Sequence, residues 1–236
     1  GLTVPQIARA FLVSDAAMEQ RITRAKQRIA QRNREGAGVP FEAPGAVERA
    51  ERLAAVAAMI YLLFNEGYSG ASDPARAPLC DEAIRLARLL LRLFPTEPEI
   101  MGLAALMLLQ QSRLGARFDA EGEAVLLEDQ DRRLWDNKLI GEGLALIDKA
   151  MRHNQPGPYQ VQAAIAAIHA RAARPAETDW ENIDALYAAL ERMQPSPVVT
   201  LNRAVVIARL KGADVALEMI APLEERLAGY FPYFAT

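Results

Sequence analysis

Cysteine, histidine and aromatic residues are scarce in this 236-residue chain, and this scarcity excludes several kinds of site. The single cysteine, Cys80, cannot form an internal disulfide, and we interpret it as a buried thiol in a reducing cytoplasm. The only histidines, His153 and His169, have no partner cysteine, and His169 is interpreted as a core residue. A P-loop, a GxGxxG motif and a GxSxG elbow are also absent. We therefore expect no catalytic residue, metal or cofactor, and a protein that is not an enzyme.

Long hydrophobic runs are missing as well. The longest, from Leu53 to Phe64, is too short to span a bilayer and predicts a buried helix. No signal peptide is visible, so we expect a cytoplasmic protein without membrane contact. Alanine and leucine are abundant and β-branched runs are few, which predicts an all-α fold. The chain lacks an initiator methionine and ends abruptly on aromatic residues, so we expect it to be part of a longer protein.

Residues 1–34 predict two helices joined by a tight turn at residues 12–14. Thr3, with a proline in the first turn and Gln6 three residues later, has the spacing of a helix start. Ser14, followed by an aspartate, would cap the second helix. Apolar residues then recur at helical spacing, at Met18, Ile22, Ala25 and Ile29.

The other face of the second helix is basic. It carries Arg21, Arg24, Lys26, Arg28 and Arg32. Residues 1–35 contain seven basic and three acidic residues, a net charge of +4, so the remainder of this −3 chain carries −7. A short capped helix followed by a basic helix is typical of a helix-turn-helix that places one helix in the DNA major groove. The alternative is a solvated basic face on an ordinary helix.

A glycine- and proline-containing linker is expected at residues 35–45, followed by a helical-repeat domain at residues 46–236. A long helix over residues 46–65 and a loop at 70–78 precede the repeats. Three helices then begin near Glu82, Glu142 and Glu181, and each glutamate is followed sixteen residues later by a proline. A second, alanine-rich helix follows each proline, at residues 99–109, 159–170 and 198–210, and a further first helix is expected at 215–227. Repeated helix pairs of this kind predict a stacked, tetratricopeptide-like array.

Residues 112–138 interrupt this pattern with a charged insertion. Its carboxylates could form a metal site or an acid/base pair, which would make the protein an enzyme. Alternatively, the insertion is structural, its charges pairing among themselves and capping neighbouring helices, or it forms a ligand or partner pocket. A recognised metal-ligand spacing is absent, so we favour the structural interpretation and expect Trp135 to be buried.

Several strings resemble one family. Residues 1–11 and 14–29, with an R-x-x-R-A-K core from Arg21 to Lys26, resemble the end of region 4 of bacterial extracytoplasmic-function sigma factors. The rest resembles the subgroup with a C-terminal tetratricopeptide-like extension. The matching strings are MIYLLFNEGY (59–68), GEAVLLEDQDRRLWD (122–136), QPGPYQVQAAIAAIH (155–169) and SPVVTLNRAVV (196–206).

The resemblance implies a transcription initiation factor that binds promoter DNA at the upstream, −35 element together with core RNA polymerase. The repeats would then be a regulatory module with a protein or small-ligand partner. Region 2, which melts the promoter, is not among these residues. The implied DNA-binding residues are Gln20, Arg21, Thr23, Arg24, Lys26 and Arg28.

In the same resemblance Met18 and Ile22 pack against Ile7 and Phe11. Glu19 departs from the family, whose helices often carry a basic residue there. The competing hypothesis is a tetratricopeptide-like interaction scaffold without direct DNA contact, in which residues 1–34 only pack.

Overall fold

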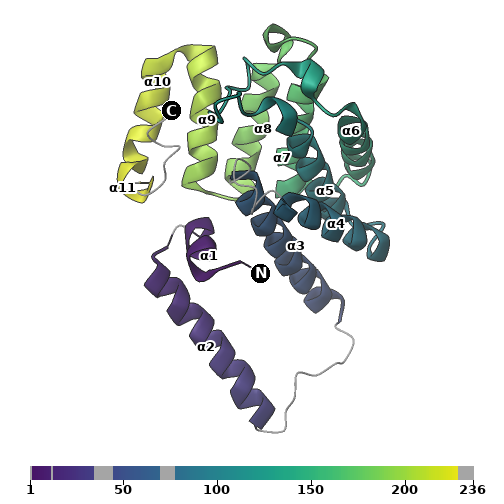
Figure 1. Ribbon diagram of the computed structural model, residues 1–236, viewed down its shortest axis with the longest axis vertical. Helices are drawn as coiled ribbons and strands as arrows, with labels where there is room; N and C mark the ends of the chain where they lie inside the picture. The colour runs from purple at the N-terminus through teal and green to yellow at the C-terminus, as the bar shows by residue number, and fades with distance from the viewer. Residues whose placement is uncertain (1, 12, 35–44, 70–77, 228–236) are drawn as a thin grey trace.

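The protein is all-α, as the composition predicts. The structure, a computed structural model, describes residues 2–11, 13–34, 45–69 and 78–227 (Figure 1). The α-helices are α1 (Val4–Ala10), α2 (Asp15–Arg34), α3 (Ala46–Ser69), α4 (Pro78–Leu93), α5 (Pro98–Gln111), α6 (Asn137–Met151), α7 (Pro158–Arg171), α8 (Trp180–Met193), α9 (Pro197–Lys211), α10 (Ala213–Ile220) and α11 (Glu224–Leu227). The 3-10 helices are η1 (Leu114–Ala116), η2 (Arg132–Leu134), η3 (Pro175–Glu177) and η4 (Ala221–Leu223). Strand pairing within the described ranges is limited to an isolated bridge between Phe118 and Ala124.

The second proline of each predicted repeat begins a helix. Pro98, Pro158 and Pro197 are the first residues of α5, α7 and α9, where a missing N–H costs nothing and the fixed φ suits the first turn. The three pairs α4 and α5, α6 and α7, and α8 and α9 therefore match the predicted helix pairs.

Some predicted boundaries are wrong. Helices α4 and α6 begin several residues before Glu82 and Glu142, and α6 does so because the Asp136 carboxylate accepts hydrogen bonds from the N–H groups of Lys138 and Leu139. The helix predicted over residues 215–227 is interrupted by η4. Pro222 lies in η4, and proline cannot continue the hydrogen bonding of a helix interior. Most of the loop predicted at residues 70–78 lies outside the described residues.

Helix α3 continues past the predicted end through Gly67 to Ser69. A Cβ at Gly67 would lie 2.8 Å from the backbone nitrogen of Cys80, so the missing side chain lets α4 begin directly against α3. The thiol of Cys80 is buried there, 3.6 Å from the carbonyl oxygen of Phe64, and burial raises its pKa to about 11. The interpretation of Cys80 as a buried thiol is confirmed.

The apolar run from Leu53 to Phe64 is not buried all round, contrary to expectation. Ala57, Ile60 and Phe64 face the core, whereas Met59 remains 59% exposed. The helix that is buried on every side is α5, in which every residue from Ile100 to Leu109 is buried. Helix α5 has this position because it packs against α4, α6 and α7 together.

The core consists of successive clusters rather than one centre. One cluster joins α3, α4 and α5, the next joins α5, α6 and α7, a third joins α7, α8 and α9, and a fourth joins α9 to α11. Figure 1 shows α7, α8, α9 and α10 side by side, and adjacent members of this series are in contact. Each helix pair therefore buries its apolar face against its neighbours in the chain.

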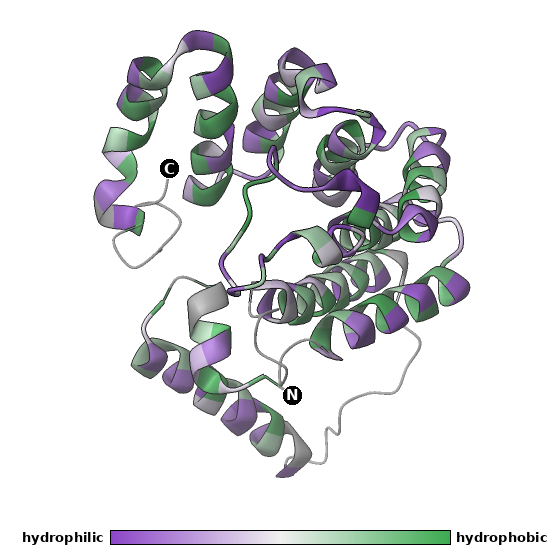
Figure 2. Cartoon of the chain, turned by 45° about the horizontal axis from the view of Figure 1, so that its top comes forward, coloured by the Kyte–Doolittle hydropathy of each residue, from purple (hydrophilic) through white to green (hydrophobic). Residues whose placement is uncertain are grey.

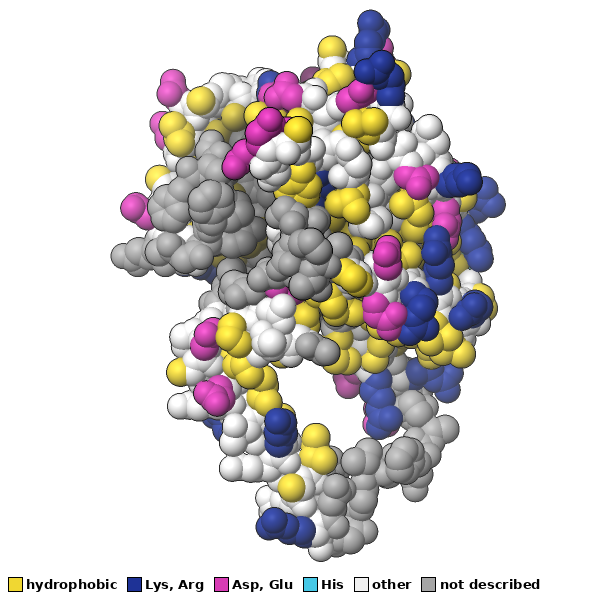
Figure 3. All heavy atoms as spheres, in the orientation of Figure 1, with side chains coloured by type: hydrophobic (Ala, Val, Ile, Leu, Met, Phe, Trp, Pro, Cys, Tyr) yellow, Lys and Arg dark blue, Asp and Glu magenta, His cyan; other side chains and the backbone are white. Residues whose placement is uncertain are grey.

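Helices α1 and α2 project from this helical body. In Figure 1 α2 extends away from the other helices, and in the space-filling view open space separates much of it from the body (Figure 3). Figure 2 shows hydrophilic and hydrophobic residues alternating along α2. Helix α1 packs against α2 and also contacts α3, where the Gln6 amide donates to a Glu66 carboxylate oxygen at 3.0 Å.

Candidate nucleic-acid interface

Both N-terminal helices begin at the predicted capping residues. The N–H and hydroxyl of Thr3 donate to Oε1 of Gln6 at 2.6 and 2.9 Å, the reciprocal half of a capping box. The Ser14 hydroxyl accepts a hydrogen bond from the Ala17 N–H at 3.3 Å and so caps α2. The N–H of Val13 reaches back to the carbonyl oxygen of Ala8, which holds the chain in a tight reversal between the helices.

The short first helix covers only the start of α2. Met18 is buried and Ile22 is half-buried, but Ala25 and Ile29 are exposed. Seven residues of α1 span about 10 Å and twenty residues of α2 about 30 Å, so the later apolar residues lie beyond the reach of α1. Phe11, the residue that follows α1, is 52% exposed, and the packing of Met18 and Ile22 against Ile7 and Phe11 stays a prediction.

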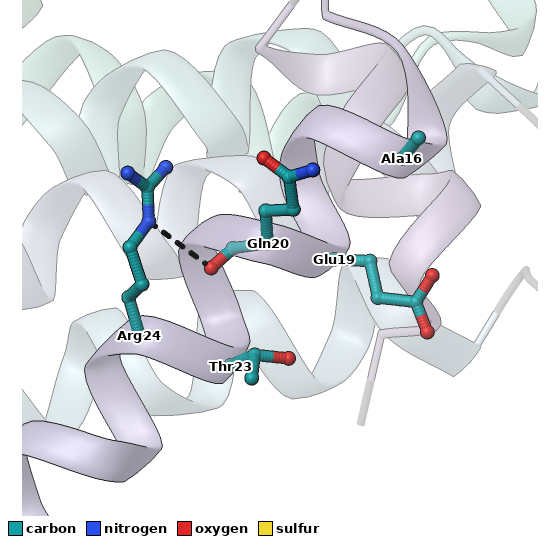
Figure 4. A pocket seen from close by; sticks show the side chains of 5 residues that line it. All are labelled: Ala16, Glu19, Gln20, Thr23 and Arg24. Carbon is teal, nitrogen blue, oxygen red and sulfur yellow. Dashed lines mark hydrogen bonds between the residues drawn. The ribbon is translucent and has the colours of Figure 1, made fainter.

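Three of the six predicted DNA-binding residues come together. Gln20, Thr23 and Arg24 line a shallow hollow on α2 with Ala16 and Glu19 (Figure 4). The Arg24 Nε donates to the Gln20 carbonyl oxygen at 3.3 Å, which orients the guanidinium over this hollow. Figure 4 shows Gln20 and Arg24 extending in a similar direction, with the Glu19 carboxylate directed away from them.

Arg21, Lys26 and Arg28 do not line this hollow. At about 100° per residue, Arg21 and Arg28 share one flank of α2, and Lys26 lies on the opposite flank. All three are exposed, so they border the face centred on Gln20. Gln27 is exposed and lies on that central face, seven residues after Gln20. The sequence analysis missed Gln27 because it weighed charge, although helical spacing alone identifies it.

The cations of α2 are not neutralised within the described part of the chain. There, no carboxylate oxygen lies within 4.0 Å of the charged atoms of Arg21, Arg24, Lys26 or Arg28. Glu19 is the one carboxylate that lines the hollow. Exposed cations on one helix with few anions nearby provide the electrostatic footprint that a polyanion requires.

The charged insertion joins three helices of the body. Arg113 and Arg117 reach α3 through Tyr68, Arg132 donates to two carbonyl oxygens at the end of α7, and Glu128 pairs with Arg209 of α9. Asp131 pairs with Arg133 within the insertion itself. These bonds agree with the structural interpretation, in which the insertion pairs its own charges and caps neighbouring helices.

Trp135 anchors the insertion and is buried, as predicted, with 4% of its surface exposed. The Arg132 guanidinium carbon lies 4.6 Å from the centre of the Trp135 ring. Over the described ranges, no three His, Cys, Asp or Glu side chains are grouped so that they could hold a metal ion. His169 is half-buried and its ring meets Trp180 edge-on, with the centroids 5.4 Å apart. None of the described helices is long and apolar enough to cross a membrane.

Comparison with known proteins gives two findings. Residues 52–151, which form α3 to α6 and the insertion, match a family of unknown function (DUF6596). The chain is 70% identical over 235 residues to the "Uncharacterized protein R00370" of Rhizobium meliloti (strain 1021). This alignment covers 99% of the chain and 54% of that protein, so the chain spans about half the length of the relative. No solved structure matches the chain.

Proposed function

We propose that the chain is the C-terminal part of a bacterial extracytoplasmic-function sigma factor that acts in transcription initiation in the cytoplasm. Helices α1 and α2 form a helix-turn-helix that binds the upstream promoter element. The helical body is a tetratricopeptide-like module that binds a regulatory partner. Core RNA polymerase is the second partner of the complete factor.

The observation that carries this proposal is the exposed basic face of α2. The helix projects from the body, its capped start follows a tight reversal, and Gln20 and Arg24 share one outward face. Arginine and glutamine side chains read base edges in the major groove, and the flanking arginines suit phosphate contacts. Because these cations lack carboxylate partners in the described ranges, a DNA backbone would not have to displace an existing ion pair.

The exposed apolar residues of α2 also support the proposal. Ala25 and Ile29 form an apolar strip that α1 is too short to cover. A helix-turn-helix is normally supported by further helices against its recognition helix. The relative from Rhizobium meliloti is about twice as long as this alignment. In a protein of that length, the additional residues would be available to cover the apolar strip of α2.

The test is promoter-duplex binding by the full-length protein across a salt series. Arg21→Ala with Arg24→Ala should weaken binding by roughly 1–3 kcal/mol for each base-specific interaction that the substitutions remove, and should reduce the salt slope by about two. Glu19→Gln should tighten binding, because it removes a negative charge from the proposed interface.

Arg152→Ala with Arg192→Ala is the matched control. Both arginines are exposed on the helical body, and this variant changes the net charge by the same amount. Equal affinity and salt slope for the two double variants would contradict the recognition-helix assignment. The second candidate function is an interaction scaffold in which α1 and α2 only pack, and the hydrogen bond from Gln6 to Glu66 favours it. Equal behaviour of the two double variants would support this second candidate.

A further inference from the structure

Three half-buried arginines gather where the insertion meets the helical body. Arg113 and Arg117 follow α5, and Arg132 lies in η2. We name Arg113, Arg117 and Arg132 the arginine cluster. It lies in the body, on residues that the proposed DNA interface does not use, and the inference drawn from it does not depend on DNA binding.

Aromatic and carbonyl groups hold the cluster in place. Arg113 Nη2 donates to the Tyr68 hydroxyl at 2.9 Å. Arg117 Nη1 donates to the Tyr68 carbonyl oxygen at 2.7 Å, and its guanidinium lies 3.6 Å from the centre of the Tyr68 ring. Arg132 Nη1 donates to the carbonyl oxygens of His169 and Ala172 at 2.7 and 2.6 Å. The guanidinium groups are thus fixed before any ligand arrives.

Within the arginine cluster, burial and the positive charge of Arg113 lower the pKa of both other arginines, Arg117 and Arg132. Burial, with Arg113 and Arg132, lowers the pKa of His169 to about 4, so this imidazole is neutral at neutral pH. The positive charges of Arg113 and Arg132 therefore act on a neutral histidine, whose carbonyl oxygen accepts a hydrogen bond from Arg132.

Among the described residues, the arginine cluster has no anionic partner. Elsewhere in the body, half-buried Arg203 bonds to both Asp184 and Glu191 at 2.7 Å. Several exposed arginines are paired as well: Arg85 with Glu82, Arg88 with Glu142, Arg171 with Asp148, Arg174 with Glu177, and Arg209 with Glu128.

The three members of the arginine cluster are half-buried like Arg203 but differ from it in their partners. No carboxylate within the described ranges lies within 4.0 Å of its three guanidinium groups. Glu177 raises the pKa of Arg132 from a distance, but its hydrogen bonds go to Arg174. The buried Nε of Arg132 also has no hydrogen-bond partner among the described residues. A buried donor without a partner is costly, and native structures satisfy most such donors with a protein group, an ordered water or an ion.

We propose that the arginine cluster binds an oxyanion, the phosphate or carboxylate group of a small molecule. The Arg113 guanidinium has five N–H donors and uses one of them for the Tyr68 hydroxyl. Its remaining donors therefore provide the main hydrogen-bonding group for the anion. Because the insertion ties α3, α7 and α9 together, a bound anion stabilises the packing of the whole helical body and couples ligand concentration to its stability.

The probes are pyrophosphate and citrate, titrated into the whole chain by calorimetry and by thermal unfolding, with potassium chloride at matched ionic strength. Either anion should bind saturably and raise the melting temperature. Arg113→Met removes the guanidinium group with little change of side-chain length and should lower the affinity for the anion at least about tenfold. Arg171→Met, which removes an exposed arginine paired with Asp148, should leave affinity unchanged.

A second measurement separates ligand binding from misfolding. Without ligand, Arg113→Met should unfold at the same or a higher temperature than the parent chain, because it removes an uncompensated positive charge. Saturable binding of pyrophosphate alone assigns a phosphate ligand, and binding of citrate alone assigns a carboxylate ligand. Stabilisation that follows ionic strength equally in both variants would overturn the proposal. Binding of an oligoglutamate peptide without either small anion would overturn it too, in favour of a protein-docking site.

Discussion

The N-terminal helix pair, α1 and α2, and the helical body, α3 to α11, use the same amphipathic patterning with different results. Among its described residues, the helix pair buries only Ala8 and Met18, whereas the body buries α5 on every side. Among the described residues, Arg21, Arg24 and Arg28 of α2 lack carboxylate partners, whereas half of the arginines of the body have one. The difference indicates that the body is completed by its own helices, while the helix pair presents surfaces that a partner must complete.

The largest expected effect is the loss of Trp135, the anchor of the insertion. Trp135→Ala should destabilise the chain by about 3–5 kcal/mol, because it leaves a large cavity beside Arg132. Leu126→Ala is the matched control in the same insertion and should have little effect, since Leu126 is 66% exposed. Urea denaturation measures both. A small effect at Trp135 would mean that the insertion is not part of the body.

One substitution made in both regions sharpens the comparison. Ile100→Ala in α5 should cost about 2–5 kcal/mol, because Ile100 is 2% exposed. Ile29→Ala in α2 should change stability by no more than about 0.5 kcal/mol, because Ile29 is 54% exposed. Equal decreases in unfolding free energy in the two variants would show that α2 packs as tightly as the body.

Acid should destabilise the body through His169. Its folded-state pKa of about 4 lies below the ordinary value of 6.5, so the unfolded chain binds the proton more readily. Its contribution to stability is complete above pH 6.5 and is lost as pH falls from there toward 4, at no more than about 1.4 kcal/mol per pH unit. His169→Gln should flatten the stability profile in this window. His153→Gln is the control, since His153 is exposed, and an unchanged profile for His169→Gln would refute the assignment.

The smallest effect is expected from removing the helix pair. Residues 46–236 should unfold cooperatively with a midpoint near that of the whole chain, because the core clusters of the body contain no residue of α1 or α2. The hydrogen bond from Gln6 to Glu66 is one link that this truncation removes. Such a bond contributes about 1 kcal/mol. Thermal unfolding followed by circular dichroism measures the change. Loss of the cooperative transition would show that the body needs α1 and α2.

Local signals in the sequence predicted much of the secondary structure. Caps such as Thr3 and Ser14, and prolines such as Pro98 and Pro158, act within one turn of the chain, so their effect can be derived without knowing the fold. The same local reasoning placed the DNA-binding candidates on one helix. It did not separate Gln20 and Arg24, which share the hollow, from Arg21 and Lys26 on its flanks, although helical spacing distinguishes these positions.

The sequence by itself determined that this protein is all-α, where the second helix of each pair begins, and that its N-terminal end is basic. These properties follow from composition, capping and periodicity, which operate over a few residues. Only the tertiary structure decided that α5 is the central helix, that Gly67 lets α4 approach α3, and that Arg113 and Arg132 gather without carboxylates. Such contacts join residues far apart in the chain, and packing, rather than local propensity, selects which of them form.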